Sequence, residues 1–263
     1  MVRIKLDVRK TIEQNAAVYY EKAKKAKRKI EGAQKALDEA RQKLAKVEAE
    51  KQKELEKIEK EEKEKQKHSE RKKHWYERFR WFISSTGFLC VGGKDATTND
   101  IIVKKHCEKG DLVFHTDIAG SPFFVIKAEG KKIDDKTKQE VAQATASFSR
   151  AWRMGINITE VYCVEPEQLR HELGLPKGTF MVYGKREYFS PTLQLAVGIT
   201  DDERIMAGPP DAIQANCSKF VFIVQGNVKN SDIAKKIKMT MGGDIDEILR
   251  ALPSGTAKIV QKI

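Results

Sequence analysis

The pattern of apolar and polar positions divides the chain at about residue 74. Between Thr11 and Lys73 there is no proline and only one glycine, Gly32, and helix-forming residues dominate, which predicts one long helix. Apolar residues recur within it at alternating steps of three and four, as in a coiled-coil seam. They are Ile30, Ala33, Leu37, Ala40, Leu44 and Val47. Leu55 and Ile58 continue the seam only after a four-residue slip. A seam this narrow predicts a partner strand, either a second copy or a segment missing from this sequence.

After residue 74, short apolar runs alternate with amphipathic segments, which predicts an α+β class. We expect a mixed, largely antiparallel sheet domain with packed helices, preceded by the long N-terminal coiled-coil helix. Strands are predicted at 88–91, 112–115, 123–126, 160–164, 180–183, 193–199, 220–224 and 259–260, and residues 2–8 are expected to form a short strand or an extended lead-in. Helices are predicted at 98–107, 134–152, 231–239 and 245–252, with a helical turn at 212–215. The domains expected are a coiled-coil arm (1–74), a globular domain (75–200) and a C-terminal α+β segment (201–263), separate or part of that domain.

The charge of the chain predicts a polyanionic partner. Its net charge is +12, and residues 1–74 alone hold 24 Lys and Arg against 15 Asp and Glu. One run has almost no interleaved acid and includes Lys22, Lys24, Lys25, Lys27 and Arg28. Such runs are often a solvated helix face, but tolerance of this repulsion favours contact with phosphates. A smaller basic pair, Lys185 and Arg186, stands at a predicted hairpin-like turn between Tyr183 and Tyr188.

Cysteine spacing and hydropathy place limits on the class of protein. The four cysteines are far apart with no CxxC pair, which disfavours a zinc site or a disulfide scaffold. No signal peptide and no run of about 20 apolar residues is present in this sequence. We therefore expect a cytoplasmic protein with no membrane partner, no metal and no cofactor.

Two polar motifs follow predicted strands. Gly92-Gly93-Lys94-Asp95, with Asn99 beyond it, lies between a strand and a helix, where backbone amides can face a phosphate; a plain tight turn is the alternative. His115 and Asp117 are two residues apart at a strand end, as an acid–base pair, a metal pair or polar groups of a turn would be. No third metal ligand and no nucleophile elbow is apparent.

An aromatic block precedes these motifs. Trp75, Phe79 and Phe82 share a face if residues 75–82 are helical, so these rings either anchor the domain core or form a platform for bases. Trp75 and Tyr76, nearest the arm, are the better candidates for stacking on bases.

Several stretches together resemble the NFACT-R domain of the NEMF/RqcH ribosome quality-control factors. They are WYERFRWFISSTGFLCVGGKDATTNDIIVKK, GDLVFHTDIAGSPFFVIK, residues 161–168 and residues 178–188. Residues 15–20 and the basic helix resemble the second coiled-coil segment of that family. The resemblance implies binding to tRNA and to large ribosomal subunit RNA on stalled peptidyl-tRNA complexes. It also implies that Lys94, Asp95, Asn99, His115, Asp117 and Gly120 occupy motif positions.

The sequence contains only the carboxy-terminal part of the family pattern. The NFACT-N domain and the first coiled-coil strand are not in it, so we expect a carboxy-terminal fragment or a short relative that does not extend nascent chains alone. The main expectation is a non-enzymatic RNA-binding module whose contacts are Lys22, Lys24, Lys25, Lys27, Arg28, Lys94, Asp95, Asn99, His115, Asp117, Lys185 and Arg186. The alternatives are a nucleic-acid hydrolase using His115 and Asp117, or a protein that dimerises through its coiled coil. Nothing in the residues separates RNA from DNA.

Overall fold

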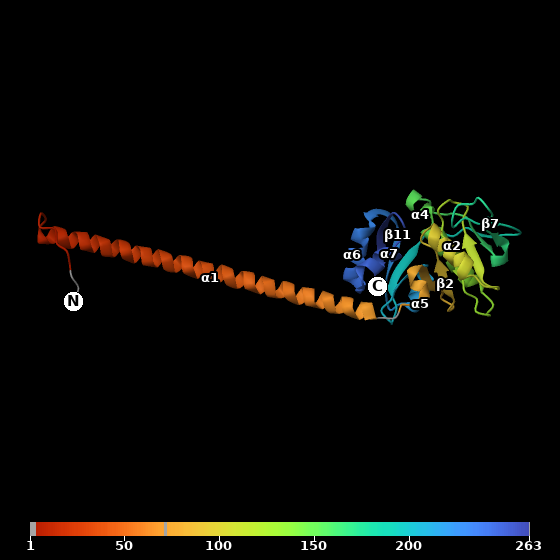
Figure 1. The fold of residues 1–263 in the computed structure, drawn as a ribbon, viewed down its shortest axis with the longest axis horizontal. Coiled ribbons are helices and arrows are strands. Elements are labelled where there is room, and N and C mark those ends of the chain that lie inside the picture. Colours follow the sequence, from red (N-terminus) through yellow and green to blue (C-terminus); the bar gives the residue numbers. More distant parts are fainter. Residues whose placement is uncertain (1–3, 71–72, 263) are drawn as a thin grey trace. The chain divides into compact units, whose positions relative to one another are not determined.

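The computed structural model describes residues 4–70 and 73–262, without the side chains of residues 36, 40, 45–70, 261 and 262. The chain forms two compact units, Met1–Arg71 and Lys72–Ile263 (Figure 1). In the described residues, none of the helices combines the length and the apolar character that a membrane span requires.

The first unit is dominated by helix α1 (Ile12–Glu70), which confirms the long helix expected from the sequence. Its start is fixed by a reciprocal capping box. The amide of Gln14 donates to Thr11 Oγ1 at 3.2 Å, and the amide of Thr11 donates to Gln14 Oε1 at 3.1 Å. Both hydrogen bonds satisfy groups that a helix terminus otherwise leaves without partners, so the chain enters the helix at a defined residue.

Residues 2–8 were expected to form a short strand or an extended lead-in, and over the described residues the second is found, because residues 4–10 form an irregular segment before α1. Asn15, which is only 7% exposed, accepts from the amide of Asp7 at 2.9 Å and donates to the Asp7 carbonyl at 3.0 Å. The hydroxyl of Tyr19 donates to the carbonyl of Lys5 at 2.6 Å. These local bonds replace the strand ladder that the alternating pattern suggested.

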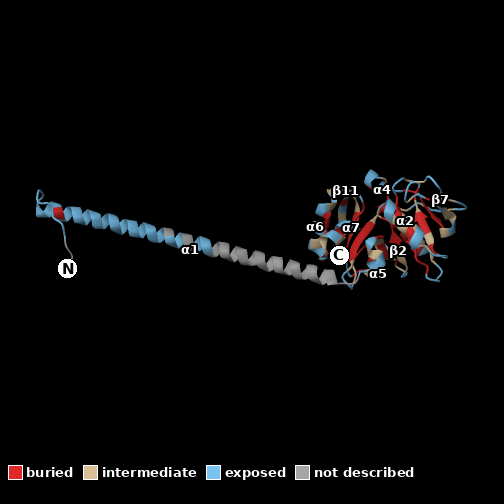
Figure 2. Cartoon of the chain, viewed as in Figure 1, coloured by how far each residue is buried: buried red, intermediate tan, exposed pale blue. Residues whose placement is uncertain are grey.

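The predicted seam of α1 is open to solvent in this single chain, as Figure 2 shows for the described part of the helix. Ile30, Leu37 and Leu44 are 69%, 47% and 59% exposed. The side chains of Val47, Leu55 and Ile58 lie outside the described residues. A partner strand for this seam therefore stays a prediction.

The second unit is built on two main sheets in which every described strand pair is antiparallel. The six-stranded sheet has the order β1-β2-β4-β3-β5-β8. Its strands are β1 (Arg80–Ile83), β2 (Leu89–Gly92), β4 (Phe124–Ile126), β3 (Leu112–His115), β5 (Val161–Val164) and β8 (Glu187–Phe189). The four-stranded sheet has the order β10-β9-β11-β12, from β10 (Ile205–Gly208), β9 (Leu195–Ile199), β11 (Lys219–Lys229) and β12 (Thr256–Lys262). These sheets and their helices confirm the predicted α+β class.

Helices cover the sheets and complete two hydrophobic clusters. They are α2 (Ala96–Lys105), α3 (Asp135–Phe148), α4 (Arg150–Met154), α5 (Pro210–Asn216), α6 (Asn230–Met241) and α7 (Ile245–Ala251). Successive residues of the central strands point to opposite faces, so Phe114 and Phe124 join the larger cluster while Val113 and Val125 join the smaller one. Burial on both faces explains why these strands are continuous apolar runs in the sequence rather than alternating ones.

Three local predictions were wrong. The aromatic block is not one helix: a 3-10 turn, η1 (Trp75–Arg78), is followed directly by β1, because pairing of β1 with β2 buries Trp81 and Phe82. The predicted helix 134–152 is interrupted at Ser149, whose extended backbone caps α4. The turn at 184–186 does not close a hairpin. It leads from β7 (Met181–Val182), which pairs with β6 (Leu169–Arg170), to β8 in the six-stranded sheet.

Residues 201–262 lie in the same compact unit as residues 73–200. Their helix α5 and strand β10 pack against β1, and the carbonyl of Leu252 accepts a hydrogen bond from the Arg80 guanidinium at 3.2 Å. Whether residues 201–263 are a separate domain or part of the domain 75–200 stays a prediction.

Candidate nucleic-acid interface

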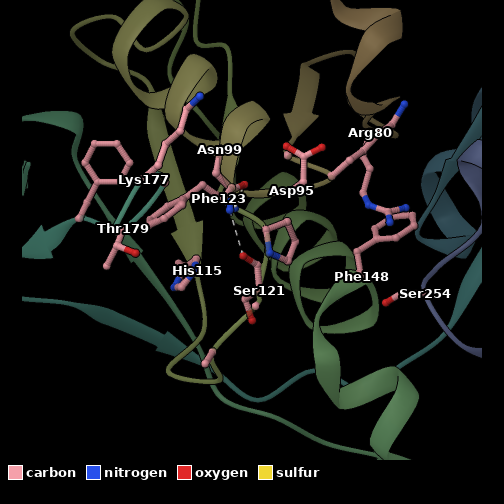
Figure 3. A pocket seen from close by; sticks show the side chains of 18 of the residues that line it. Arg80, Asp95, Asn99, His115, Ser121, Phe123, Phe148, Lys177, Thr179 and Ser254 are labelled. Carbon is pink, nitrogen blue, oxygen red and sulfur yellow. Dashed lines mark hydrogen bonds between the residues drawn. The ribbon is translucent and has the colours of Figure 1, made fainter. Parts of the chain in front are cut away.

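A pocket of about 340 Å³ brings several of the predicted site residues together (Figure 3). Five of those that line it were expected from the sequence: the predicted contacts Lys94, Asp95, Asn99 and His115, and the motif residue Gly120. The loop 119–123, the loop 177–180 and Ser254 complete its wall. The pocket therefore joins the strand ends of the six-stranded sheet to the C-terminal segment.

Two cations converge in this pocket. Burial lowers the pKa of Arg80 to about 10, and its guanidinium is held 4.3 Å from the Phe148 ring centroid. Burial also lowers the pKa of Lys94 to about 8, and the nearby charges of Arg80 and Arg250 lower it further, against the opposing effect of Asp95. Among the described side chains neither Arg80 nor Lys94 has an ion-pair partner.

The backbone around Lys94 is fixed by close internal contacts. The amides of Lys94 and Asp95 both donate to Thr98 Oγ1, at 2.8 and 2.9 Å, and the amide of Gly93 donates to the Phe123 carbonyl at 3.1 Å. These three amides are therefore engaged, which matches the tight-turn alternative for this motif rather than a cradle of free amides. What the turn offers to a ligand is the Lys94 ammonium.

Asp95 caps α2. Its Oδ1 accepts from the amide of Thr98 at 2.8 Å, and hydrogen bonds from Thr98 are the largest cause of its lowered pKa. The other described side chains that line the pocket are cationic, neutral or aromatic. The wall is therefore predominantly positive even with this carboxylate in place.

Asn99 joins two walls of the pocket. It is 7% exposed; its Nδ2 donates to the Ser121 carbonyl at 3.2 Å and its Oδ1 accepts from the Phe123 amide at 3.1 Å. A Cβ at Gly93 would lie 1.9 Å from Asn99 Oδ1, so only glycine permits this approach. Both polar groups of the amide are engaged, and Asn99 holds the loop 121–123 against the start of α2.

His115 and Asp117 do not form the pair considered from the sequence. The His115 ring stacks on Phe123, with centroids 4.0 Å apart, and its Nδ1 lies 3.2 Å from the Tyr162 hydroxyl. Burial lowers the pKa of His115 to about 4, so the ring is neutral near pH 7. Asp117 is exposed and pairs with Arg186 at 3.4 Å instead.

The remaining predicted contacts lie on surfaces outside this pocket. The Arg186 guanidinium stands 4.6 Å from the ring centroid of Tyr162, whereas Lys185 is exposed and its carbonyl accepts from Gln168 at 2.8 Å. On α1, within the other unit, the predicted basic residues are all exposed: Lys22, Lys24, Lys25, Lys27 and Arg28.

Aromatic side chains of the block behave differently from one another. Trp75 is 41% exposed and stacks on His106 at 4.2 Å, whereas the Tyr76 hydroxyl accepts from Arg204 at 3.1 Å. Phe79 and Phe82 are buried in the two hydrophobic clusters. Of the two rings expected to stack on bases, Trp75 is the more exposed.

Sequence reasoning missed Arg80, Lys177 and Ser254. Arg80 lies inside the aromatic block whose spacing suggests a helix, and the register of β1 is needed to turn it toward the pocket. Lys177 lies in an irregular segment, and Ser254 reaches the pocket only through long-range packing. No group of three or more metal-ligating side chains comes together among the described residues.

Comparison with known proteins identifies this region. Residues 78–184 match the family described as the NFACT protein RNA binding domain. The chain is 41% identical over 202 residues to the archaeal Rqc2 homolog aRqcH of Methanocaldococcus jannaschii, covering 73% of this chain and 30% of that protein. It is 32% identical over 187 residues to the ribosome quality control complex subunit NEMF of Mus musculus, covering 68% of this chain and 16% of that protein.

More distant matches agree with these. Ribosome quality control complex subunit 2 of Schizosaccharomyces pombe is 31% identical over 131 residues, covering 46% of this chain and 12% of that protein. The chain thus spans less than a third of the length of these curated relatives. A solved C-terminal structure of the fibronectin/fibrinogen-binding protein from Streptococcus suis aligns with a TM-score of 0.41 and 24% identity over 51% of this chain and 50% of that one, too distant to support an inference. The chain carries an NFACT RNA-binding domain and belongs to the RqcH/NEMF family of ribosome quality-control factors.

Proposed function

We propose that this chain binds structured RNA, namely tRNA and large-subunit ribosomal RNA on stalled peptidyl-tRNA complexes in the cytoplasm. The observation that carries the proposal is the convergence of Arg80 and Lys94 in one pocket of the NFACT RNA-binding domain. Two like charges that are partly removed from water repel each other, and the depressed pKa of Lys94 reflects that cost. A phosphate placed between them would offset both the repulsion and the lost hydration.

The basic run of α1 is the proposed second contact. Its cations are exposed, and residues 22–29 include six Lys and Arg with no acid among them. Each phosphate neutralised releases counterions, so affinity should fall with a slope of about −0.7 to −0.9 per contact in a plot of log K against log salt. The pocket and the basic run of α1 would together contact an RNA longer than either of them could cover alone.

The positions of His115 and Asp117 favour RNA binding without catalysis. His115 is neutral, stacked on Phe123 and close to the Tyr162 hydroxyl, while Asp117 is paired with Arg186. A general acid–base pair needs the two groups within hydrogen-bond reach of one substrate proton. The hydrolase alternative therefore has little support from the positions of these side chains.

A coiled-coil partner is a second proposal, based on the exposure of Ile30, Leu37 and Leu44 along one seam. It does not compete with RNA binding. A partner strand would cover the seam and leave the cations of the α1 run available.

A titration with labelled tRNA tests the RNA-binding proposal. The full chain and the variants Lys94→Gln and Lys109→Gln would be compared by fluorescence anisotropy at several salt concentrations. Lys109 is exposed and outside the pocket, so its loss removes the same charge without touching the site. Lys94→Gln should weaken binding about fivefold to tenfold and reduce the salt slope by about one contact, with a smaller effect from Lys109→Gln. Equal effects of the two substitutions would show that the pocket is not part of the RNA interface.

A further inference from the structure

The pocket has two ends of different chemistry. In Figure 3, Arg80 and Ser254 lie on one side, whereas His115, Phe123 and Thr179 lie on the other. The first end holds the Arg80 guanidinium over the Phe148 ring, and the second holds the His115 and Phe123 rings with Lys177 beside them. A nucleotide joins an anionic phosphate through a sugar to a planar base, so its phosphate suits the Arg80 end and its base the end lined by the His115 and Phe123 rings.

The aromatic end is a set of rings held in fixed orientations. His115 lies nearly parallel to Phe123, with an interplanar angle of 20°, and Phe180 meets Phe123 edge-on, with centroids 5.5 Å apart. Because His115 is uncharged near neutral pH, this end can face a base without burying a cation. Phe123 and Phe180 are only 3% and 9% exposed, so they support the half-buried His115, whose ring is the one offered to a base. Proteins commonly recognise unstacked RNA bases by stacking them on aromatic side chains.

The size of the pocket limits what can enter. A volume of about 340 Å³ is near the lower limit of small-ligand sites, which span roughly 300–1,000 Å³. A base pair within a duplex cannot be accommodated, whereas a single extruded nucleotide can. Extrusion costs least for a nucleotide that is already unpaired.

We therefore propose that the pocket receives one unpaired nucleotide of the bound RNA, its phosphate against Arg80 and Lys94 and its base toward His115. This inference rests on the RNA-binding function proposed above and specifies which element of the RNA the pocket binds. Two roles are then separate: α1 contributes charge that any phosphate satisfies, and the pocket selects RNA with a looped-out nucleotide.

The test uses the full chain and two RNA hairpins with one common stem. Each hairpin is closed by a hexaethylene glycol linker in place of a nucleotide loop, so that one is fully paired and the other carries a single unpaired nucleotide, a bulged 2-aminopurine. We expect about tenfold tighter binding of the bulged hairpin, as stacking of one base would supply, with a change in 2-aminopurine fluorescence on binding. Adenosine monophosphate, added as competitor, should reduce that fluorescence change, because it carries the same base-and-phosphate unit.

Blocking variants make the test specific to the pocket. Thr179→Met, or Ala119→Met as a second variant, adds apolar volume at an exposed position of the pocket wall without altering charge. Either should abolish the preference and the fluorescence change while affinity for the paired hairpin stays within about twofold. Thr240→Met, on the exposed surface of α6, is the matched control and should change nothing.

The possible outcomes separate the two proposals. Equal binding of both hairpins, both weakened by Lys94→Gln, would overturn the nucleotide inference and leave RNA binding intact. The nucleotide inference is equally overturned if Thr179→Met and Ala119→Met weaken both hairpins to the same extent. Failure to bind either hairpin at low salt would overturn the proposed function itself.

Discussion

The lowered pKa of Lys94 makes RNA binding depend on pH in a window where Arg80, His115 and Tyr162 of the same pocket change their charge little. The pKa of Lys94 is about 8, against 10.5 for an unperturbed lysine. Arg80 has a pKa of about 10, His115 of about 4 and Tyr162 of about 12, so their charges change little between pH 7 and 9. Raising the pH through 8 therefore removes the Lys94 charge from the free protein.

The magnitude follows from proton linkage. If a bound phosphate returns the pKa of Lys94 to its ordinary value, affinity falls about tenfold between pH 7 and pH 9. If the pKa recovers by only about one unit because solvent screens the site, the loss is about fivefold. The sign is fixed: the charged form binds, so deprotonation weakens binding. Without RNA, the contribution of Lys94 to the free energy of unfolding changes in the opposite sense. It increases as pH rises from the pKa of Lys94 in the folded chain, about 8, toward the ordinary value of 10.5 in the unfolded chain.

The assay is a tRNA titration by fluorescence anisotropy at constant ionic strength, at half-unit steps from pH 7 to 9, with Lys94→Gln as the matched control. Titration of the RNA itself is common to both proteins and cancels in the ratio of their affinities. That ratio should decline about fivefold to tenfold with a midpoint near pH 8. A ratio that stays flat across this range would refute the reasoning that Lys94 contacts phosphate.

Three other predictions concern the arm, the pocket wall and chemistry. Replacing Lys24, Lys25, Lys27 and Arg28 with Glu should weaken tRNA binding at least tenfold and flatten its salt dependence by roughly three contacts; unchanged filter-binding curves would exclude the arm. Asn99→Ala should lower the free energy of unfolding, measured in urea, by about 2–4 kcal/mol, because it leaves the Phe123 amide and the Ser121 carbonyl unpaired. The control Asn227→Ala, at an exposed position, should lower it by less than about 0.5 kcal/mol. A smaller difference between the two variants would contradict the role of Asn99 in holding the loop 121–123 against α2. End-labelled tRNA incubated with the chain should stay intact on a denaturing gel, and cleavage that His115→Ala abolishes would revive the hydrolase alternative.

The long helix and most strands of the second unit could be predicted from the sequence because their signals are local. The run of helix formers after Thr11 carries its own cap, and the apolar runs at 112–115 and 123–126 become β3 and β4. The aromatic block could not be predicted in this way. Trp81 and Phe82 suit a helix or a strand, and only pairing with β2 decides between them.

The candidate site could be predicted in part for the same reason. Lys94 and His115 stand beside turn signals at strand ends, where binding residues commonly occur. Arg80 and Ser254 could not be found, because the residues between them fold through a second sheet before Leu252 meets the Arg80 guanidinium. Asn99 does join the pocket wall, but its engagement with Ser121 and Phe123 required the tertiary structure.

Photo-crosslinking of the full chain to tRNA carrying 4-thiouridine, followed by mass spectrometry of the crosslinked peptides, tests the central claim most directly. We expect crosslinks in peptides that span residues 93–99, 115–123 and 177–180 around the pocket, together with the basic run of α1, all lost at high salt. Crosslinks confined to other surfaces of the second unit, or none in dilute buffer, would contradict RNA binding at the pocket.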